Sequence, residues 1–307
     1  MAAAIRFGEG EDLIDIRMDN VFKAVFTKNS RASKTALARL VSAIIGRDVK
    51  VLTIAANEPP IESTRDRQIR FDINCQARGG EKINVEMCLN PDPFEPVRLE
   101  FYTAKLFSGQ DIRGTDKSYD VLKRTYQIAI LARKRFFPDG DFFHSFEYYD
   151  PTRRVSLNGQ TRILTLELTK LEEVAQKPAR KMSAPEKWAV YFQYLNNSGM
   201  RPKINEIIEQ EEGIAMASEV LRGISRDEAE RARLLSEYKG QVDQQSKMAY
   251  AKQQGIKRGR KEGLKEGRKE GREEANLENA RKMKGLGISI KHIHTVTGLP
   301  AETIEKL

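Results

Sequence analysis

Two alternating segments on either side of a glycine-containing turn constrain the fold of this chain more than any other feature. The segments RQIRFDINCQA, residues 67–77, and KINVEMCL, residues 82–89, alternate apolar and polar side chains, which is typical of strands with one buried face. The four residues between them, Arg-Gly-Gly-Glu at 78–81, are turn-forming. The sequence therefore predicts an antiparallel hairpin over residues 67–89.

The register of this hairpin decides whether two carboxylates meet. A three-residue loop at 78–80 places Asp72 opposite Glu86 on one face, whereas a two-residue loop at 79–80 opposes Asp72 to Met87. In the first register the two carboxylates lie ~5 Å apart and repel each other. A divalent cation between them is the usual way to neutralise such a pair. A carboxylate on a solvent-facing strand is the alternative, and it is commonplace.

Segments with helical spacing and further strand-like runs surround the hairpin. Before it we predict a helix over residues 20–26 with Asp19 as its N-cap, a helix from about Ser33 to Gly46, and a strand at 49–55. After it we predict a helix over 96–110 and a buried strand at 125–132. Farther along we predict strands within 142–150 and 160–171, a helix over 184–195 capped near Ser183, and one or two long polar helices over 203–250.

The composition is that of a chain with one good-sized core and accessory segments. Of the 307 residues, 39% are hydrophobic and 32% are charged. The net charge is +9, and residues 251–307 contribute most of it, with 14 Lys and Arg against 8 Asp and Glu. A basic tail is compatible with nucleic acid or another polyanion, and equally with a solvated charged helix.

Neither a signal sequence nor a membrane span is evident in the sequence. The N-terminal residues contain no apolar core flanked by basic residues, and no apolar run approaches the ~20 residues that cross a bilayer. Two cysteines, Cys75 and Cys88, are too few for a disulfide framework in a chain of this length. We therefore expect a cytoplasmic protein with no membrane partner.

Short motifs in a fixed order carry a resemblance to a known family. MDNVFKAVF, RFDINCQ and INVEMCLN are followed by VRLEFYTAKLFSGQ and YQIAIL, and then by LELTKLEE and EKWAVYF. In this order and spacing they resemble the Rpn family of recombination-promoting nucleases and transposases, within the PD-(D/E)XK nuclease superfamily. The resemblance covers nearly the whole chain. It implies an α/β, restriction-endonuclease-like fold, a mixed sheet flanked by helices with a helical C-terminal extension.

The resemblance also implies which residues carry chemistry. Asp72 matches the family's metal-binding aspartate, and Glu86 matches the glutamate of its E-x-K or E-x-Q motif. Both would hold Mg²⁺, or another divalent cation such as Mn²⁺ or Ca²⁺, at a DNA endonuclease site. Asp19 matches an acidic residue of the family's first helix and completes the metal shell, unless it is simply a helix N-cap. Gln110 matches a family glutamine that faces the site and its DNA, unless it is a solvent-facing helix residue.

Cys88 departs from the family pattern. It stands two residues after Glu86, where the motif has Lys or Gln as a catalytic residue. A lysine there supplies a cation and a glutamine can donate a hydrogen bond, whereas a neutral thiol does neither well and a thiolate is too soft a ligand for Mg²⁺. Weak catalysis, a lysine recruited from elsewhere, and a degenerate nuclease fold are all open.

A glycine at every fourth position marks residues 255–274. A four-residue step keeps these five glycines on one slowly drifting stripe of a helix, Gly255, Gly259, Gly263, Gly267 and Gly271. Either a helix of a second copy packs into this groove and forms a homodimer, or the repeat is a marginal, solvated helix or linker. Four basic residues here are candidate DNA contacts: Lys257, Arg258, Arg260 and Lys261.

The C-terminal residues have the order of a helix-turn-helix fragment. SIKHIHTV and PAETIEKL flank the turn residues TGL, although two short helices lack a third to pack on. We thus expect a nuclease-like domain over 1–200, a helical accessory region over 201–250, a charged glycine-repeat helix or linker over 251–275, and a helix-turn-helix-like tail over 276–307. The functional hypothesis is a metal-dependent DNA endonuclease in recombination or mobile-element activity, and its rival is a degenerate DNA-binding or protein-interaction module.

Overall fold

The computed structural model describes residues 5–54, 72–91, 93–112, 118–157 and 159–307. The chain divides into two compact units, Met1–Tyr238 and Lys239–Leu307, which are described separately. The predicted strand residues 67–71 lie outside the described residues.

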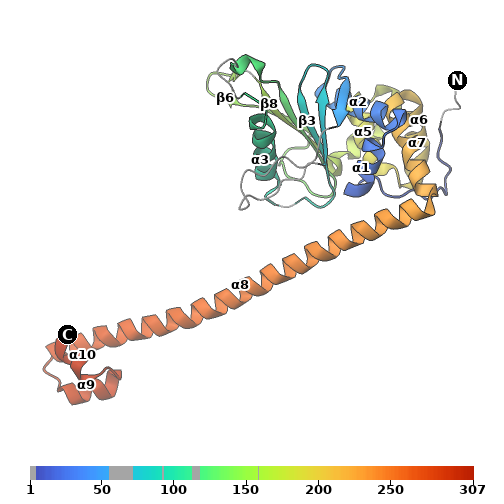
Figure 1. Cartoon of the computed structure of the whole chain (residues 1–307). Coiled ribbons are helices and arrows are strands. Elements are labelled where there is room, and N and C mark those ends of the chain that lie inside the picture. Colours follow the sequence, from blue (N-terminus) through green and yellow to red (C-terminus); the bar gives the residue numbers. More distant parts are fainter. Residues whose placement is uncertain (1–4, 55–71, 92, 113–117, 158) are drawn as a thin grey trace. The chain divides into compact units, whose positions relative to one another are not determined.

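A mixed six-stranded sheet forms the centre of the first unit (Figure 1). Its strands lie side by side in the order β1 (Val51–Ile54), β2 (Ile73–Ala77), β3 (Lys82–Cys88), β4 (Thr125–Leu131), β8 (Thr161–Glu167) and β5 (Phe143–Phe146). β3, β4 and β8 are parallel, and β1, β2 and β5 add antiparallel edges. A short hairpin of β6 (Tyr149–Asp150) and β7 (Val155–Ser156) stands apart from it. The predicted mixed sheet flanked by helices is confirmed.

Helices cover both faces of this sheet (Figure 1). One face carries α3 (Glu95–Ser108), which packs on β4 and β8. The other carries the remaining helices of the unit: α1 (Asp19–Thr27), α2 (Arg31–Ile45), α4 (Glu172–Gln176), α5 (Ala184–Tyr194), α6 (Arg201–Gln210) and α7 (Glu212–Arg226). Single 3₁₀ turns at Tyr119–Val121, Leu168–Lys170, Ala179–Lys181 and Ser198–Met200 join these elements.

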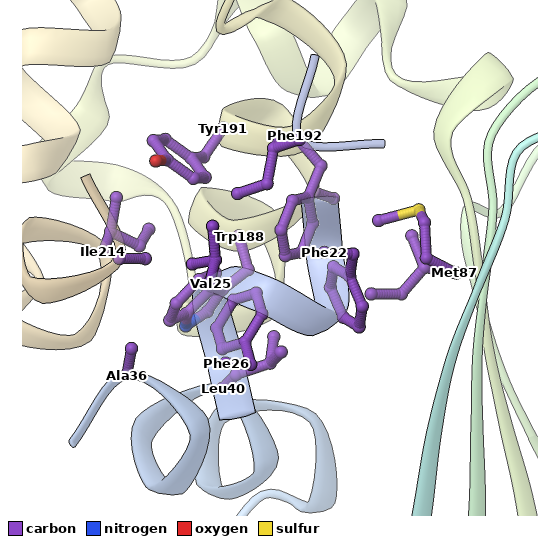
Figure 2. Close-up of a cluster of buried hydrophobic side chains, with 14 of the residues drawn as sticks. Phe22, Val25, Phe26, Ala36, Leu40, Met87, Trp188, Tyr191, Phe192 and Ile214 are labelled. Carbon is purple, nitrogen blue, oxygen red and sulfur yellow. The ribbon is translucent and has the colours of Figure 1, made fainter. Parts of the chain in front are cut away.

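The main hydrophobic core lies between the sheet and α1, α2, α5, α6 and α7. Figure 2 shows Phe22 and Phe26 of α1 against Trp188 and Phe192 of α5, with Met87 pointing from β3 toward Phe22. The rings of Phe22 and Phe26 lie 4.7 Å apart and those of Trp188 and Phe192 lie 5.5 Å apart, distances at which aromatic pairs attract. Because this face takes the large apolar side chains, the opposite face of the same strands is free to carry polar ones.

The helix ends agree with the sequence at two places and disagree at a third. Gly46 ends α2 in the left-handed conformation with φ 81°, and Ser183 and Glu186 form a capping box at the start of α5. The predicted N-cap role of Asp19 is wrong. α1 begins at Asp19 itself, and its carboxylate lies 2.9 Å from the ammonium nitrogen of Lys23, one turn later.

The helices after residue 200 are part of the core, contrary to the expected accessory region at 201–250. α6 and α7 bury a continuous set of apolar side chains in the main core: Ile204, Ile207, Ile208, Ile214, Ala217, Leu221 and Ile224. α7 packs along α2. The mostly polar sequence of this stretch hid a narrow apolar face, since only one side of each helix needs to be buried.

One helix, α8 (Glu228–Gly285), runs from the first unit into the second. The glycine repeat is helical, and a methyl group added at any of its five glycines would meet no atom within 4 Å. At the end of the chain α9 (Ile290–Thr297) and α10 (Ala301–Lys306) pack on the last turns of α8 through Ala280, Ile293 and Ile304. The third helix that the tail was expected to lack is therefore the end of α8.

No helix in the described part of the chain is long and apolar enough to cross a membrane.

The close packing of α7 on α2 can be tested by substitution of two glycines in α7. A Cβ added at Gly213 would overlap the Cβ of Arg39 and lie 3.0 Å from Cζ2 of Trp188, so Gly213→Ala should destabilise the protein by about 1–3 kcal/mol. Gly223, on the same helix, has open space around it, and Gly223→Ala should stabilise by about 0.5–1 kcal/mol through helix propensity. Urea denaturation measures both, and equal effects of the two substitutions would contradict the packing.

Candidate functional site

The hairpin of β2 and β3 has the register that brings the two carboxylates together. Ile73 pairs with Val85, and the same register continued by one residue sets Asp72 beside Glu86. Of the two loops considered, the structure has the three-residue one, because Ala77 donates its N–H to the carbonyl of Glu81 at 3.0 Å. Both carboxylates are buried, with Asp72 8% and Glu86 3% exposed.

Asp72 is held by a backbone group and by a cation. Its Oδ2 accepts the N–H of Met87 at 3.2 Å, and its Oδ1 lies 3.0 Å from the Nζ of Lys23. The same Nζ lies 2.9 Å from Oδ1 of Asp19. Lys23 therefore bridges Asp19 and Asp72, and α1 contributes two of the site's side chains.

Glu86 is held by a cation and by a side-chain amide. Its Oε1 lies 2.7 Å from Nη1 of Arg98, which comes from α3, and its Oε2 accepts Nε2 of Gln127 at 3.2 Å. Gln127 is fixed in turn, because its Oε1 accepts Nδ2 of Asn84 at 3.0 Å. Asn84, Glu86 and Gln127 lie on one face of two adjacent parallel strands, so the strand register itself aligns this hydrogen-bond chain.

Arg98 joins two carboxylates and the cysteine. Its Nε donates to Oε1 of Glu95 at 3.0 Å, its Nη2 pairs with the same oxygen, and Nη2 also lies 3.4 Å from Sγ of Cys88. Sγ of Cys88 is 3.5 Å from Oε1 of Glu95. One ligand atom from each of Glu86, Cys88 and Glu95 falls within 4.8 Å of the others.

The site holds more negative charge than its own cations neutralise. Within the described residues, four carboxylates meet two cationic side chains: Asp19, Asp72, Glu86 and Glu95 against Lys23 and Arg98. Burial, followed by repulsion from Asp19, raises the pKa of Asp72 to about 6. Burial, followed by repulsion from Asp72, raises the pKa of Glu86 to about 8. A bound divalent cation would supply positive charge to this cluster.

The donor set fits a hard divalent cation. Mg²⁺ and Mn²⁺ prefer carboxylate oxygens, and Asp72 and Glu86 present theirs from neighbouring strands. Lys23 already shows that a cation is accommodated between Asp19 and Asp72. Asp19, which sequence reasoning left open between two roles, thus reaches the site through Lys23.

Cys88 contributes a neutral thiol. Its side chain is buried on the same face as Glu86, and burial, followed by the charges of Glu86 and Glu95, raises the pKa of the thiol well above its usual range. A protonated thiol supplies no positive charge and is a poor metal ligand. The position that the family motif gives to Lys or Gln therefore supplies neither the cation of a lysine nor the amide of a glutamine.

The other predicted site residues are not joined to the carboxylates by the contacts described above. Gln110 lies beyond the end of α3 rather than on the helix. Its amide donates to the carbonyl of Lys123 at 2.8 Å and accepts the N–H of Lys123 at 2.9 Å, so it ties the α3 end to the start of β4. Lys257, Arg258, Arg260 and Lys261 are exposed on α8 in the second unit.

Sequence reasoning missed several residues that contact the carboxylates. They are Lys23, Asn84, Glu95, Arg98 and Gln127. Two signals were present: Asn84, Glu86 and Cys88 alternate on one strand face, and a glutamine interrupts the apolar strand TYQIAIL. Glu95 and Arg98 are spaced i,i+3 on a helix, but only the packing of α3 on the sheet shows that they face Glu86.

Comparison with known families gives one match. A family model described as PD-(D/E)XK nuclease family transposase matches residues 16–251, a range that includes α1, the hairpin and α3. Nucleases of this class generally use divalent metal ions. No curated protein sequence and no solved structure matches the chain.

The raised pKa values predict how stability depends on pH. A carboxyl group whose pKa is higher in the folded chain than in the unfolded chain, where it is near about 4, binds its proton more tightly when folded. The stability that such a group contributes is present at low pH and is lost as the pH rises through the pKa that the group has in the folded chain. In EDTA we therefore expect the free energy of unfolding to fall between about pH 5 and about pH 8, as measured by urea denaturation.

Other groups titrate in the same range, so the comparison is with Asp72→Asn/Glu86→Gln, in which neither side chain titrates. The double variant should lose less stability than the wild type over this interval. Saturating Mn²⁺ should flatten the wild-type curve, because metal binding favours the deprotonated carboxylates. Parallel curves for the wild type and the double variant would contradict the raised pKa values.

Proposed function

Because the chain belongs to the PD-(D/E)XK nuclease family transposases, we propose that it is a metal-dependent DNA endonuclease that acts in recombination or in mobile-element activity. The observation that supports this most is the meeting of Asp72 and Glu86 on adjacent strands, in a cluster with an excess of negative charge. Carboxylates that were merely structural would gain by being fully neutralised. When all four carboxylates are ionised, they carry two more charges than Lys23 and Arg98 supply, which is the charge of one divalent cation.

The side chains have distinct tasks in this proposal. Asp72 and Glu86 hold the cation, Asp72 fixed by the N–H of Met87 and Glu86 oriented by Gln127. Asp19, which now pairs with Lys23, would contribute a further oxygen. The bound cation supplies an activated water and stabilises the charge that develops on the phosphodiester.

A catalytically degenerate DNA-binding or protein-interaction module is the alternative. Two observations favour it: Lys23 and Arg98 already pair with the carboxylates, and Cys88 offers neither a cation nor a hydrogen bond suited to the reaction. In that case the fold persists while the chemistry is lost.

Cleavage of duplex DNA separates the two functions. Purified wild-type protein should cleave DNA with Mg²⁺ or Mn²⁺, whereas Asp72→Asn and Glu86→Gln should each lower the rate by about 100-fold or more, beyond the 10–100-fold typical of losing an outer-shell partner. Reactions with Ca²⁺ and with EDTA complete the metal series. Cleavage is followed on gels with labelled duplex and single strands.

The matched control is Asp150→Asn, which removes an exposed carboxylate that pairs with Arg153 far from the cluster in sequence. It should cleave as the wild type does. A wild type that cleaves no DNA with any of the metals, or equal cleavage by all the variants, would rule out the endonuclease and leave the degenerate module.

We also propose that the protein acts as a cytoplasmic homodimer whose α8 helices pair along the glycine stripe, with the neighbouring basic residues on DNA phosphates. The open space around the five glycines supports close approach of a second helix, and Lys257, Arg258, Arg260 and Lys261 are exposed. A dimer suits a nuclease that cuts two strands.

Sedimentation velocity tests the pairing. The wild type should sediment as a dimer, and Gly263→Gln/Gly267→Gln, which fills the groove, should be a monomer. Lys265→Gln, on the face of the helix opposite the stripe, should remain dimeric. A wild-type monomer at all concentrations would contradict the pairing, and the solvated helix would remain.

A further inference from the structure

The cation missing from strand β3 has a counterpart on α3. Cys88 and Glu86 project from the same face of β3, two residues apart, and the guanidinium of Arg98 lies against both, 3.4 Å from Sγ of Cys88 and 2.7 Å from Oε1 of Glu86. We propose that Arg98 is the catalytic cation of this site and contacts the scissile phosphate in place of the motif's Lys or Gln. The proposal rests on the proposed endonuclease function.

The short side chain of Cys88 and the long one of Arg98 complement each other. Leu99, the next residue on α3, packs in a small apolar cluster with Cys88, Ala129 and Leu131, so α3 is fixed on this face of the sheet. A lysine at position 88 would extend into the space where the guanidinium now lies, because Sγ is already at contact distance from it. Cys88 therefore makes room for a cation that enters from the helix.

Glu95 prepares Arg98 for this task. It holds Nε and Nη2 from one helical turn earlier, while Nη1 alone points to Glu86. With Glu86 holding a metal ion, Arg98 would keep Glu95 as its partner and Nη1 would be free to donate to a phosphate oxygen. The guanidinium also lies 5.3 Å from the centre of the Tyr102 ring, which supports its position.

Arg98 has the access and charge that the reaction requires. Its side chain is 36% exposed, so that it reaches solvent from a buried cluster. The neighbouring carboxylates raise its pKa further despite its burial, and it stays charged at every working pH. Planar donors suit the oxygens of a phosphate.

Other described cations near the cluster are less suited. Lys23 is engaged by both Asp19 and Asp72. Lys170, in the 3₁₀ turn that follows β8, has a side chain that is 1% exposed and pairs with the buried Glu167. The ion pairs of these two lysines include neither Glu86 nor Cys88.

The test combines removal of the cation with its return at the family position. Arg98→Ala should lower kcat for cleavage about 100-fold, as the loss of a charge-stabilising donor does, and Arg98→Lys should retain part of the rate. Arg98→Ala/Cys88→Lys should recover at least about 10-fold over Arg98→Ala. Arg153→Ala, which breaks another i,i+3 Arg–carboxylate pair, should cleave as the wild type does.

Metal affinity distinguishes catalysis from mere support of Glu86. Calorimetric titration with Mn²⁺ should show equal or tighter binding to Arg98→Ala, since a competing cation has left Glu86. Duplex affinity in EDTA should weaken in Arg98→Ala, with the slope of log K against log salt reduced by about one. A positioning role would instead loosen Glu86 and weaken Mn²⁺ binding. Thermal melting checks that each variant is folded.

The outcomes are separable. Cleavage by the wild type and equal cleavage by Arg98→Ala would overturn the role of Arg98 and leave the endonuclease intact. Lost cleavage with weakened Mn²⁺ binding and no recovery in Arg98→Lys or in the double variant would also overturn it, in favour of support for Glu86. A wild type that cleaves nothing would overturn the endonuclease, and the role of Arg98 with it.

Discussion

The repulsion between Asp72 and Glu86 is the interaction on which the rest of the site depends. The three-residue loop of the hairpin sets the two carboxylates side by side in a buried place, where burial raises the pKa of both and the charge of Asp72 raises that of Glu86 further. Such a pair is costly unless positive charge is near. Lys23 of α1 pairs with Asp72, and Arg98 of α3 pairs with Glu86. Gln127 of β4 donates a hydrogen bond to the other oxygen of Glu86 and orients it.

One face of the sheet packs in the main hydrophobic core, and the other carries the side chains of the site. Val85 and Met87 point into the main core, while Asn84, Glu86 and Cys88 alternate with them on the face that α3 covers. Because strand alternation separates the two sets, the large apolar side chains stabilise the fold without entering the site. α3 therefore buries polar as well as apolar side chains against this face of the sheet.

The sequence predicted the features that depend on local pattern and register. The helix ends at Gly46 and Ser183 follow from capping, and alternation limited the hairpin to two registers, of which the structure has the one with the loop at 78–80. The mixed sheet was implied by the family resemblance. Arg98 and Lys23 were not predicted, because their roles arise from how helices dock on the sheet rather than from spacing along the chain. The packing of α6 and α7 in the core was missed for the same reason.

The helix α8 has its ends in two different cores. Leu234, near its start, is buried with the sheet domain, and Ala280, near its end, is buried with α9 and α10. The five glycines between them lower helix propensity by about 4–5 kcal/mol relative to alanine. This middle stretch is thus the first part of the helix expected to open by local unfolding, while the core at each end of the helix remains folded.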